Sequence, residues 1–218
     1  MPRRSPAPTE HIGAAMRETG TARIEGFSDG VFAIAATLLV LDIGVRSPTG
    51  LRLGHELLRI WPSYLAYLTS FLTIGIIWIN HHHNMRAIGH ADRTFMFINL
   101  LLLLDVAFLP FPTKLVADYL GESGDARAAA YAYGGTLLLM AVAFNVLWAY
   151  ARGNRRLIRD DFPQPKVRAV TLATLIGVPL TGLVLLLATW TPLGSVVFAL
   201  AISAFYLPGV MLFDRITE

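Results

Sequence analysis

The chain contains no cysteine, few charged residues and no leader-like amino terminus, and each shortage excludes a class of protein. Without cysteine there are no disulfides, no thiolate metal ligands and no cysteine nucleophile. Charged residues make up only 15% of the 218 residues, well below the share in a soluble domain. The amino terminus reads Met-Pro-Arg-Arg-Ser-Pro, with no apolar stretch before a cleavage site. We therefore expect no signal peptide and a first helix that remains in the mature protein.

Apolar residues are what the chain has in excess. They form 55% of it, the mean hydropathy is +0.55, and they gather into runs of about 20 residues, the length of helix that crosses a bilayer. The pattern predicts an all-α membrane protein with six transmembrane helices, at about 24–45, 62–81, 94–113, 128–151, 167–190 and 193–213. Residues 1–22 are polar and are interpreted as a cytoplasmic tail, followed by one six-helix domain over 23–218.

The basic residues give the orientation. With the amino terminus inside, 13 of the 18 Lys and Arg residues fall in inner segments, which predicts that both termini are cytoplasmic. The same bias accounts for the pI of about 9.4 without a nucleic-acid partner. We expect a multi-pass protein of the plasma membrane, in contact with lipid.

The first helix is the most informative segment. Glu25, Asp29 and Asp42 flank its apolar middle, and a carboxylate deep in lipid costs about 2.5–3.5 kcal/mol, so this helix is expected to be enclosed by an assembly. It carries small residues and aliphatic residues at helical spacing: Gly26, Gly30, Ala33 and Thr37, and Val31, Ile34, Leu38, Leu41 and Val45. By periodicity alone the aliphatic set fits core packing or lipid contact as well as a pore wall.

Several segments resemble the transmembrane protein 175 family of potassium channels. They are Arg23-x-x-x-Phe27-Ser28-Asp29 with the following Gly30–Leu41, Trp78-x-x-His81-His82, Asn99-Leu100 and Leu109-Pro110-Phe111-Pro112. The resemblance covers about 23–112 and fades beyond it to matching hydropathy. It implies a homotetramer of six-helix chains, without enzyme activity or cofactor, that conducts potassium and other monovalent cations through a central pore.

The resemblance also implies roles for individual residues. The first helices surround the pore, with Ile34 at a hydrophobic constriction, Leu38 and Leu41 on the same wall, and Thr37 as a nearby polar candidate. Positions such as Phe32 and Val40 are expected to face outward. The chain has no Thr-Val-Gly-Tyr-Gly segment, which excludes a carbonyl selectivity filter of that kind.

Polar residues near the inner ends of the first three helices are the next candidates. The resemblance implies a structural network of Arg23, Ser28, Asp29, Trp78, His81 and Asn99, in which Arg23 pairs with Asp29. Asp42 is either a ring of acids at the pore mouth or an interfacial acid exposed to water.

Two features leave an alternative open. Asp105 is an acid in the middle of a membrane helix, and His81, His82 and His83 follow one another. Together they would suit a secondary transporter or a proton-leak protein. A metal site, and with it a metal-dependent hydrolase, is not expected, because consecutive helical residues point about 100° apart and do not converge on one ion.

Overall fold

The computed structural model describes the backbone of residues 8–44, 53–121, 124–154 and 156–217, and side chains for 21–41, 43–44, 53–121, 124–154 and 156–206. Within these ranges the chain is helical apart from short connections and one isolated backbone bridge between Ile88 and Ile158. The elements are α1 (Pro8–Leu38), η1 (Leu39–Asp42), α2 (Leu53–Arg59), α3 (Trp61–Ala87), α4 (Arg93–Phe108), α5 (Pro110–Tyr119), α6 (Ala126–Gly153), α7 (Gln164–Leu187) and α8 (Pro192–Thr217).

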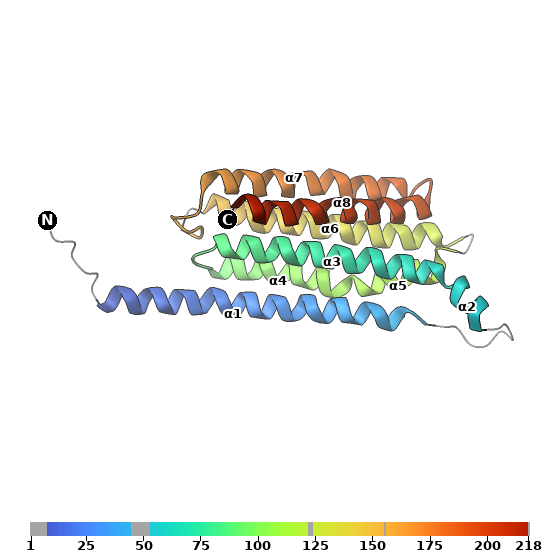
Figure 1. Ribbon diagram of the computed structural model, residues 1–218, viewed down its shortest axis with the longest axis horizontal. Helices are drawn as coiled ribbons and strands as arrows, with labels where there is room; N and C mark the ends of the chain where they lie inside the picture. The colour runs from blue at the N-terminus through green and yellow to red at the C-terminus, as the bar shows by residue number, and fades with distance from the viewer. Residues whose placement is uncertain (1–7, 45–52, 122–123, 155, 218) are drawn as a thin grey trace.

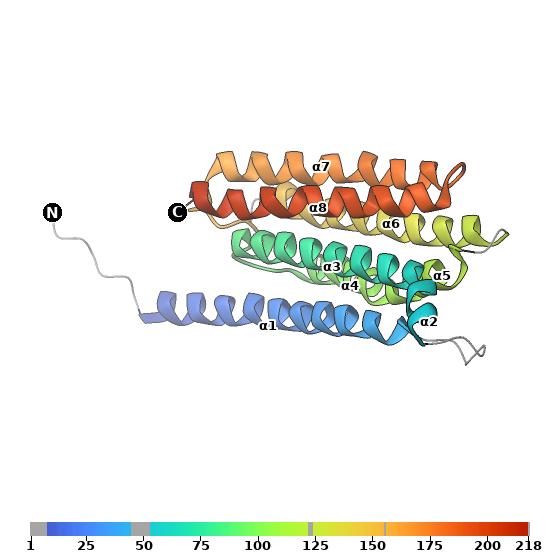
Figure 2. The same ribbon diagram turned by 45° about the vertical axis from the view of Figure 1, so that its right-hand side comes forward.

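The long helices run side by side along one axis (Figure 1). Helix α1 lies along one side, α3 with α4 and α5 forms the middle, and α6, α7 and α8 form the other side. The turned view in Figure 2 keeps α1 and α7 on opposite sides of the bundle. The start of α1 and the end of α8 lie at the same end, which we call the amino end.

The prediction of an all-helical membrane chain is confirmed. Among the residues with described side chains, five helical stretches are long and apolar enough to cross a bilayer: Thr21–Leu41, Trp61–Ala87, Arg93–Tyr119, Ala126–Gly153 and Gln164–Leu187. The described part of α8, Pro192–Tyr206, is apolar but shorter.

Proline explains one difference from the expected spans. The third helix was expected to end at the Pro110-Phe111-Pro112 segment, but the structure bends there and continues as α5 to Tyr119. Proline fits the first turn of a helix, where its missing N–H would have no partner, so Pro110 starts a new helix. The preceding residue, Leu109, still donates its backbone N–H to the Asp105 carbonyl oxygen at 3.2 Å.

Two other helices differ from expectation. Helix α1 begins at Pro8, inside the segment interpreted as a tail, where alanine, glutamate and methionine are good helix formers. A short helix, α2, lies between the first two long ones, and its buried Glu56 is paired with Arg59 at 3.2 Å.

The core is apolar, apart from a few buried side chains with hydroxyl groups. One apolar cluster joins η1, α4, α5 and α6. Its fully buried members include one residue from each of these elements: Leu39, Leu102, Val116 and Met140. Polar contacts between helices accompany this packing: the Ser70 hydroxyl donates to Tyr133 Oη at 3.0 Å and lies 2.8 Å from Thr113 Oγ1. These bonds join α3, α5 and α6 at side chains that are almost fully buried, so each hydroxyl needs a protein partner.

Candidate pore helix and its polar anchor

Helix α1 has one packed face and one open face. The packed face holds Ser28, Phe32, Ala35 and Leu39, at spacings of three and four residues, and all four are buried. The open face is defined by Gly26, Gly30, Ile34, Thr37, Leu38 and Leu41, and all six residues are exposed. Ile34 is 61% exposed and Leu41 74%, although both are apolar. The predicted pore-wall residues Ile34, Thr37, Leu38 and Leu41 therefore lie on the side that no helix among the described residues covers (Figure 1).

The open face combines small and aliphatic side chains. A Cβ atom added at Gly26 or Gly30 would meet nothing within 4 Å, so the helix surface there is bare backbone. The Thr37 hydroxyl donates to the Ile34 carbonyl oxygen at 2.9 Å, which satisfies its proton within the helix and leaves oxygen lone pairs facing outward.

The packed face is fixed by a buried bond network around Asn99 of α4. Asn99 Oδ1 lies 2.8 Å from His81 Nε2 of α3, and Asn99 Nδ2 donates to Ser28 Oγ of α1 at 3.1 Å. The Ser28 hydroxyl in turn donates to the Ile24 carbonyl oxygen at 2.9 Å. All three side chains are almost fully buried, so one amide bridges three helices where no water competes.

A second pair of contacts joins α1 to α3 at the rim of this network. The Trp78 indole N–H donates to Asp29 Oδ1 at 2.9 Å, and His82 Nδ1 lies 2.8 Å from Glu25 Oε1. Glu25 and Asp29 are four residues apart on α1, as are Trp78 and His82 on α3, and the two helices run antiparallel. Residues four apart share a helix face, so two such pairs on antiparallel helices meet in reverse order.

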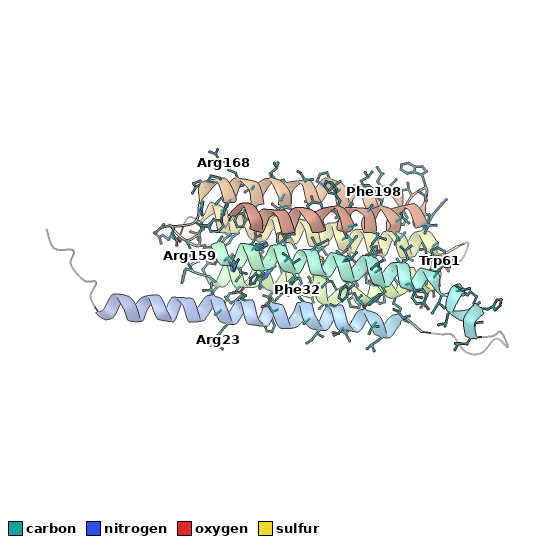
Figure 3. All side chains as sticks on the ribbon, viewed as in Figure 1. Arg23, Phe32, Trp61, Arg159, Arg168 and Phe198 are labelled. Carbon is teal, nitrogen blue, oxygen red and sulfur yellow. The ribbon has the colours of Figure 1, made fainter. Side chains whose placement is uncertain are left out.

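The expected pairing of Arg23 with Asp29 is not formed within the described part of this chain. Arg23 is exposed, and no described contact links it to Asp29, whose partner is Trp78. The reason is helical geometry: positions six apart are separated by about 240° around the axis, so the two side chains leave α1 in different directions. Figure 3 shows Arg23 pointing away from the bundle.

Phe32 was expected to face outward and does not. It is 2% exposed, and its ring lies against that of His81, with centroids 5.4 Å apart. The position is indeed opposite Ile34 on the helix, but that opposite side is the protein core rather than lipid. Val40, the second outward position, is 50% exposed.

The histidine run and Asp105 are not brought together. His81 turns inward to Asn99, whereas His82 turns to Glu25, as expected for consecutive helical residues. Asp105 is buried, its Oδ2 has no hydrogen-bond partner among the described residues, and no described contact joins it to a histidine. Six residues separate it from Asn99, a rise of roughly 9 Å along α4. Within the part of the chain with described side chains, no group of three or more metal-binding side chains gathers.

Asp42 closes η1, but its side chain lies outside those described, as does Val45.

A pair of hydrogen bonds at the amino end, both made by Asp92, was not predicted. Asp92 caps α4 by accepting from the Phe95 backbone N–H at 2.8 Å, and it accepts the Tyr150 hydroxyl of α6 at 2.7 Å. These two hydrogen bonds, the backbone one first, hold the pKa of Asp92 below its usual value. An aspartate directly before a helix was a visible capping signal, but its partner on α6 was not visible in the sequence.

Comparison with known proteins gives one consistent result. Residues 23–110 match the family model described as endosomal/lysosomal potassium channel TMEM175. A potassium channel of Streptomyces collinus is 44% identical over 163 residues, 74% of this chain and 78% of that protein. The endosomal/lysosomal proton channel TMEM175 of Gallus gallus is 39% identical over 110 residues, 46% of this chain but 22% of that protein.

A solved structure agrees along most of the chain. The crystal structure of a lysosomal potassium-selective channel TMEM175 homolog from Chamaesiphon minutus superposes with a TM-score of 0.80 and 39% sequence identity. The alignment covers 88% of this chain and 98% of that one.

Proposed function

The chain belongs to the TMEM175 channel family, and we propose that it conducts potassium through a pore built by four copies of itself, with α1 innermost. The observation that carries this proposal is the open face of α1. Small residues on a membrane helix allow close approach of another helix, and no element among the described residues covers this face, so it is free to meet copies of itself around a pore.

Ile34 is the proposed constriction. In a fourfold assembly, each open-face residue becomes a ring of four side chains. An aliphatic ring offers no oxygen to replace a hydration shell, so passage depends on its diameter and on whether water fills it. Potassium holds its shell less tightly than sodium, and partial dehydration at the ring therefore costs potassium less. Leu38 and Leu41 extend the apolar wall, and the outward lone pairs of Thr37 are a nearby polar ring.

The Asn99 network is proposed to hold the pore helix in place. Its bonds lie on the packed face of α1 and join it to α3 and α4, while Trp78 and His82 engage Asp29 and Glu25 beside it. A helix fixed on one side by short polar contacts keeps a constant angle, which a ring of four identical side chains requires.

The remaining features follow from the charge bias and the helix count. We infer six transmembrane helices, with α8 as the sixth, both termini in the cytoplasm, and a plasma-membrane location. Asp42 at the far end of the pore helix is proposed to concentrate cations at the mouth. Monovalent cations are the expected permeant partners, and no cofactor is needed.

The test is Ile34→Asn, measured as current from purified protein in planar bilayers under potassium and sodium gradients. An amide at the ring eases wetting, so conductance is expected to rise and the preference for potassium over sodium to fall. Val40→Asn is the matched control, because Val40 is 50% exposed in η1, directly after α1, and is not one of the open-face residues.

Two outcomes contradict the proposal. If Val40→Asn changes conductance and selectivity while Ile34→Asn does not, another face lines the pore. Native mass spectrometry of the protein in mild detergent is expected to give a tetramer, and a monomer or dimer under conditions that support current would exclude the fourfold arrangement.

A further inference from the structure

A groove at the amino end of the bundle is the second notable surface of the molecule. It has a volume of about 730 Å³ and lies between the end of α6, the following loop and the first turns of α7. Its polar end is formed by Arg152, Arg159, Asp160 and Arg168, and its other wall by Val167, Leu172 and Leu175. Figure 3 places Arg159 and Arg168 at this end, with Arg168 on the α7 side of the bundle, away from Arg23.

The groove carries net positive charge that its described lining residues do not neutralise. Among its described lining residues, three arginines face one acid, Asp160. Arg159 is engaged by Asp161 through two bonds of 3.1 and 3.3 Å, and this pairing lowers the pKa of Asp161. Arg152 and Arg168 are exposed and have no ion-pair partner among the described residues. Two unpaired guanidinium groups at one end of a cavity are suited to an anionic oxygen group such as phosphate.

The apolar wall continues from the arginines into the membrane-spanning part of α7. Arg168, Leu172 and Leu175 follow at spacings of four and three residues, so they lie on one face of the helix over a rise of about 10 Å. Leu172 is 62% exposed and Leu175 57%. The charged end and the hydrocarbon end of the groove are therefore arranged along the bilayer normal.

Between the arginines and the leucines, the Thr171 hydroxyl has its hydrogen bonds within the protein. The Thr171 hydroxyl donates to the Val167 carbonyl oxygen at 2.7 Å and accepts the indole N–H of buried Trp148 at 2.9 Å. These polar atoms are thus used within the protein. Recognition is left to the arginines at the head of the groove and to the leucines along its length.

We propose that this groove binds an anionic phospholipid, with its phosphate at Arg152 and Arg168 and an acyl chain along Leu172 and Leu175. Helix α7 lies on the side of the bundle opposite α1 in both views, which is the lipid-facing side if α1 lines the pore (Figure 2). A basic pocket at a cytoplasmic helix end with an apolar wall below it fits a lipid with a charged headgroup. The inference requires the proposed membrane orientation, but it does not require potassium conduction.

The test is lipid binding by native mass spectrometry on the full-length protein in neutral detergent. Phosphatidylglycerol and phosphatidylcholine with identical acyl chains are titrated separately, and wild type is expected to bind the first more tightly by at least 10-fold. Removal of one arginine charge near a membrane surface weakens binding by roughly 5-fold, so Arg152→Gln with Arg168→Gln is expected to lower phosphatidylglycerol affinity about 25-fold. Phosphatidylcholine affinity should fall much less, because its choline cation offsets the phosphate charge at the arginines.

The controls separate a lipid site from general charge. Lys114→Gln with Arg127→Gln removes two exposed cations elsewhere and should leave phosphatidylglycerol affinity unchanged. Arg152→Lys with Arg168→Lys keeps the charge and should restore most of the affinity. Equal binding of both lipids, an equal loss in the Lys114 and Arg127 control, or lysine variants as weak as the glutamine variants with wild-type melting curves would each overturn the proposal.

A last arm distinguishes a lipid from a free anion. Leu172→Ser with Leu175→Ser keeps the arginines and shortens the apolar wall, so it should weaken phosphatidylglycerol binding several-fold. If it has no effect and millimolar inorganic phosphate displaces the lipid, the groove is a site for soluble phosphate and the lipid proposal is wrong.

Discussion

Asn99→Leu is the most informative test of the packed face of α1. The change keeps the approximate volume of a buried side chain and removes two interhelical bonds, to His81 and to Ser28. Their consequences differ, because the Ser28 hydroxyl still donates to the Ile24 carbonyl oxygen, whereas both ring nitrogens of His81 would lack a protein partner.

The magnitude follows from that difference. An interhelical hydrogen bond in a membrane protein contributes on average about 0.6 kcal/mol, which is the expected cost at Ser28. A buried polar group left without its partner costs about 1–3 kcal/mol, which applies to His81. Asn99→Leu is therefore expected to lower the free energy of unfolding by about 2–4 kcal/mol.

The assay is unfolding in increasing sodium dodecyl sulfate mole fraction, followed by far-ultraviolet circular dichroism. Asn80→Leu is the matched control, because among the described residues Asn80 Nδ2 donates only to the Ile76 carbonyl oxygen of its own helix, at 3.0 Å. That change should cost at most about 1 kcal/mol. If Asn99→Leu is no more destabilising than Asn80→Leu, the network does not fix α1 to its neighbours.

Three further predictions concern other parts of the bundle. Gly134→Ala should destabilise by about 1–3 kcal/mol in the same assay, because its Cβ would lie 3.1 Å from the backbone of α7, whereas Gly135→Ala, with open space around it, should be neutral or stabilising. Asp92→Ala should cost about 1 kcal/mol at neutral pH. The folded-state pKa of Asp92 is lowered, so its carboxylate stabilises the fold above the usual aspartate pKa, and this stabilisation is lost as pH falls through the folded-state pKa. The melting temperatures of wild type and variant should therefore converge in acid. Asp105→Leu should raise the free energy of unfolding by about 1 kcal/mol or more, because it removes a buried carboxyl oxygen with no described partner, and a fall in stability would reveal a partner for that oxygen.

The sequence was sufficient for the helices and insufficient for their ends. Apolar runs of membrane length predicted the long helices, because a helix that crosses the hydrocarbon layer must be made of apolar residues over that length. Helix α3 nevertheless extends to Ala87, beyond the expected end at His81, because backbone bonding continues through the polar interface after hydropathy has fallen. A proline in an apolar run predicts the end of a helix, and the local sequence does not show that Pro110 begins a second one.

For α1, too, the sequence predicted some features of its faces and not others. Helical spacing correctly grouped Ile34, Leu38 and Leu41 on one side, since periodicity fixes relative directions around an axis. It did not say whether the opposite side, with Phe32, meets lipid or protein, because that depends on where α3 and α4 lie. The prediction for Arg23 differs, because a spacing of six residues already disfavours a shared helix face with Asp29. The sequence also holds two pairs spaced by four, Glu25 with Asp29 and Trp78 with His82, which meet in the structure.

The apolar character of the open face of α1 bears on how the protein is made. A newly inserted single chain turns Ile34, Leu38 and Leu41 toward lipid, which is hydrocarbon against hydrocarbon and carries no penalty before partners arrive. A hydrated polar pore wall would instead leave each waiting chain with unpaired groups in the bilayer. The same absence of penalty means that burial of this face gives no hydrophobic gain on assembly. Because small residues permit close backbone approach, we expect Gly26 and Gly30 to contribute to subunit recognition, and substitutions there to slow maturation without harming the single chain.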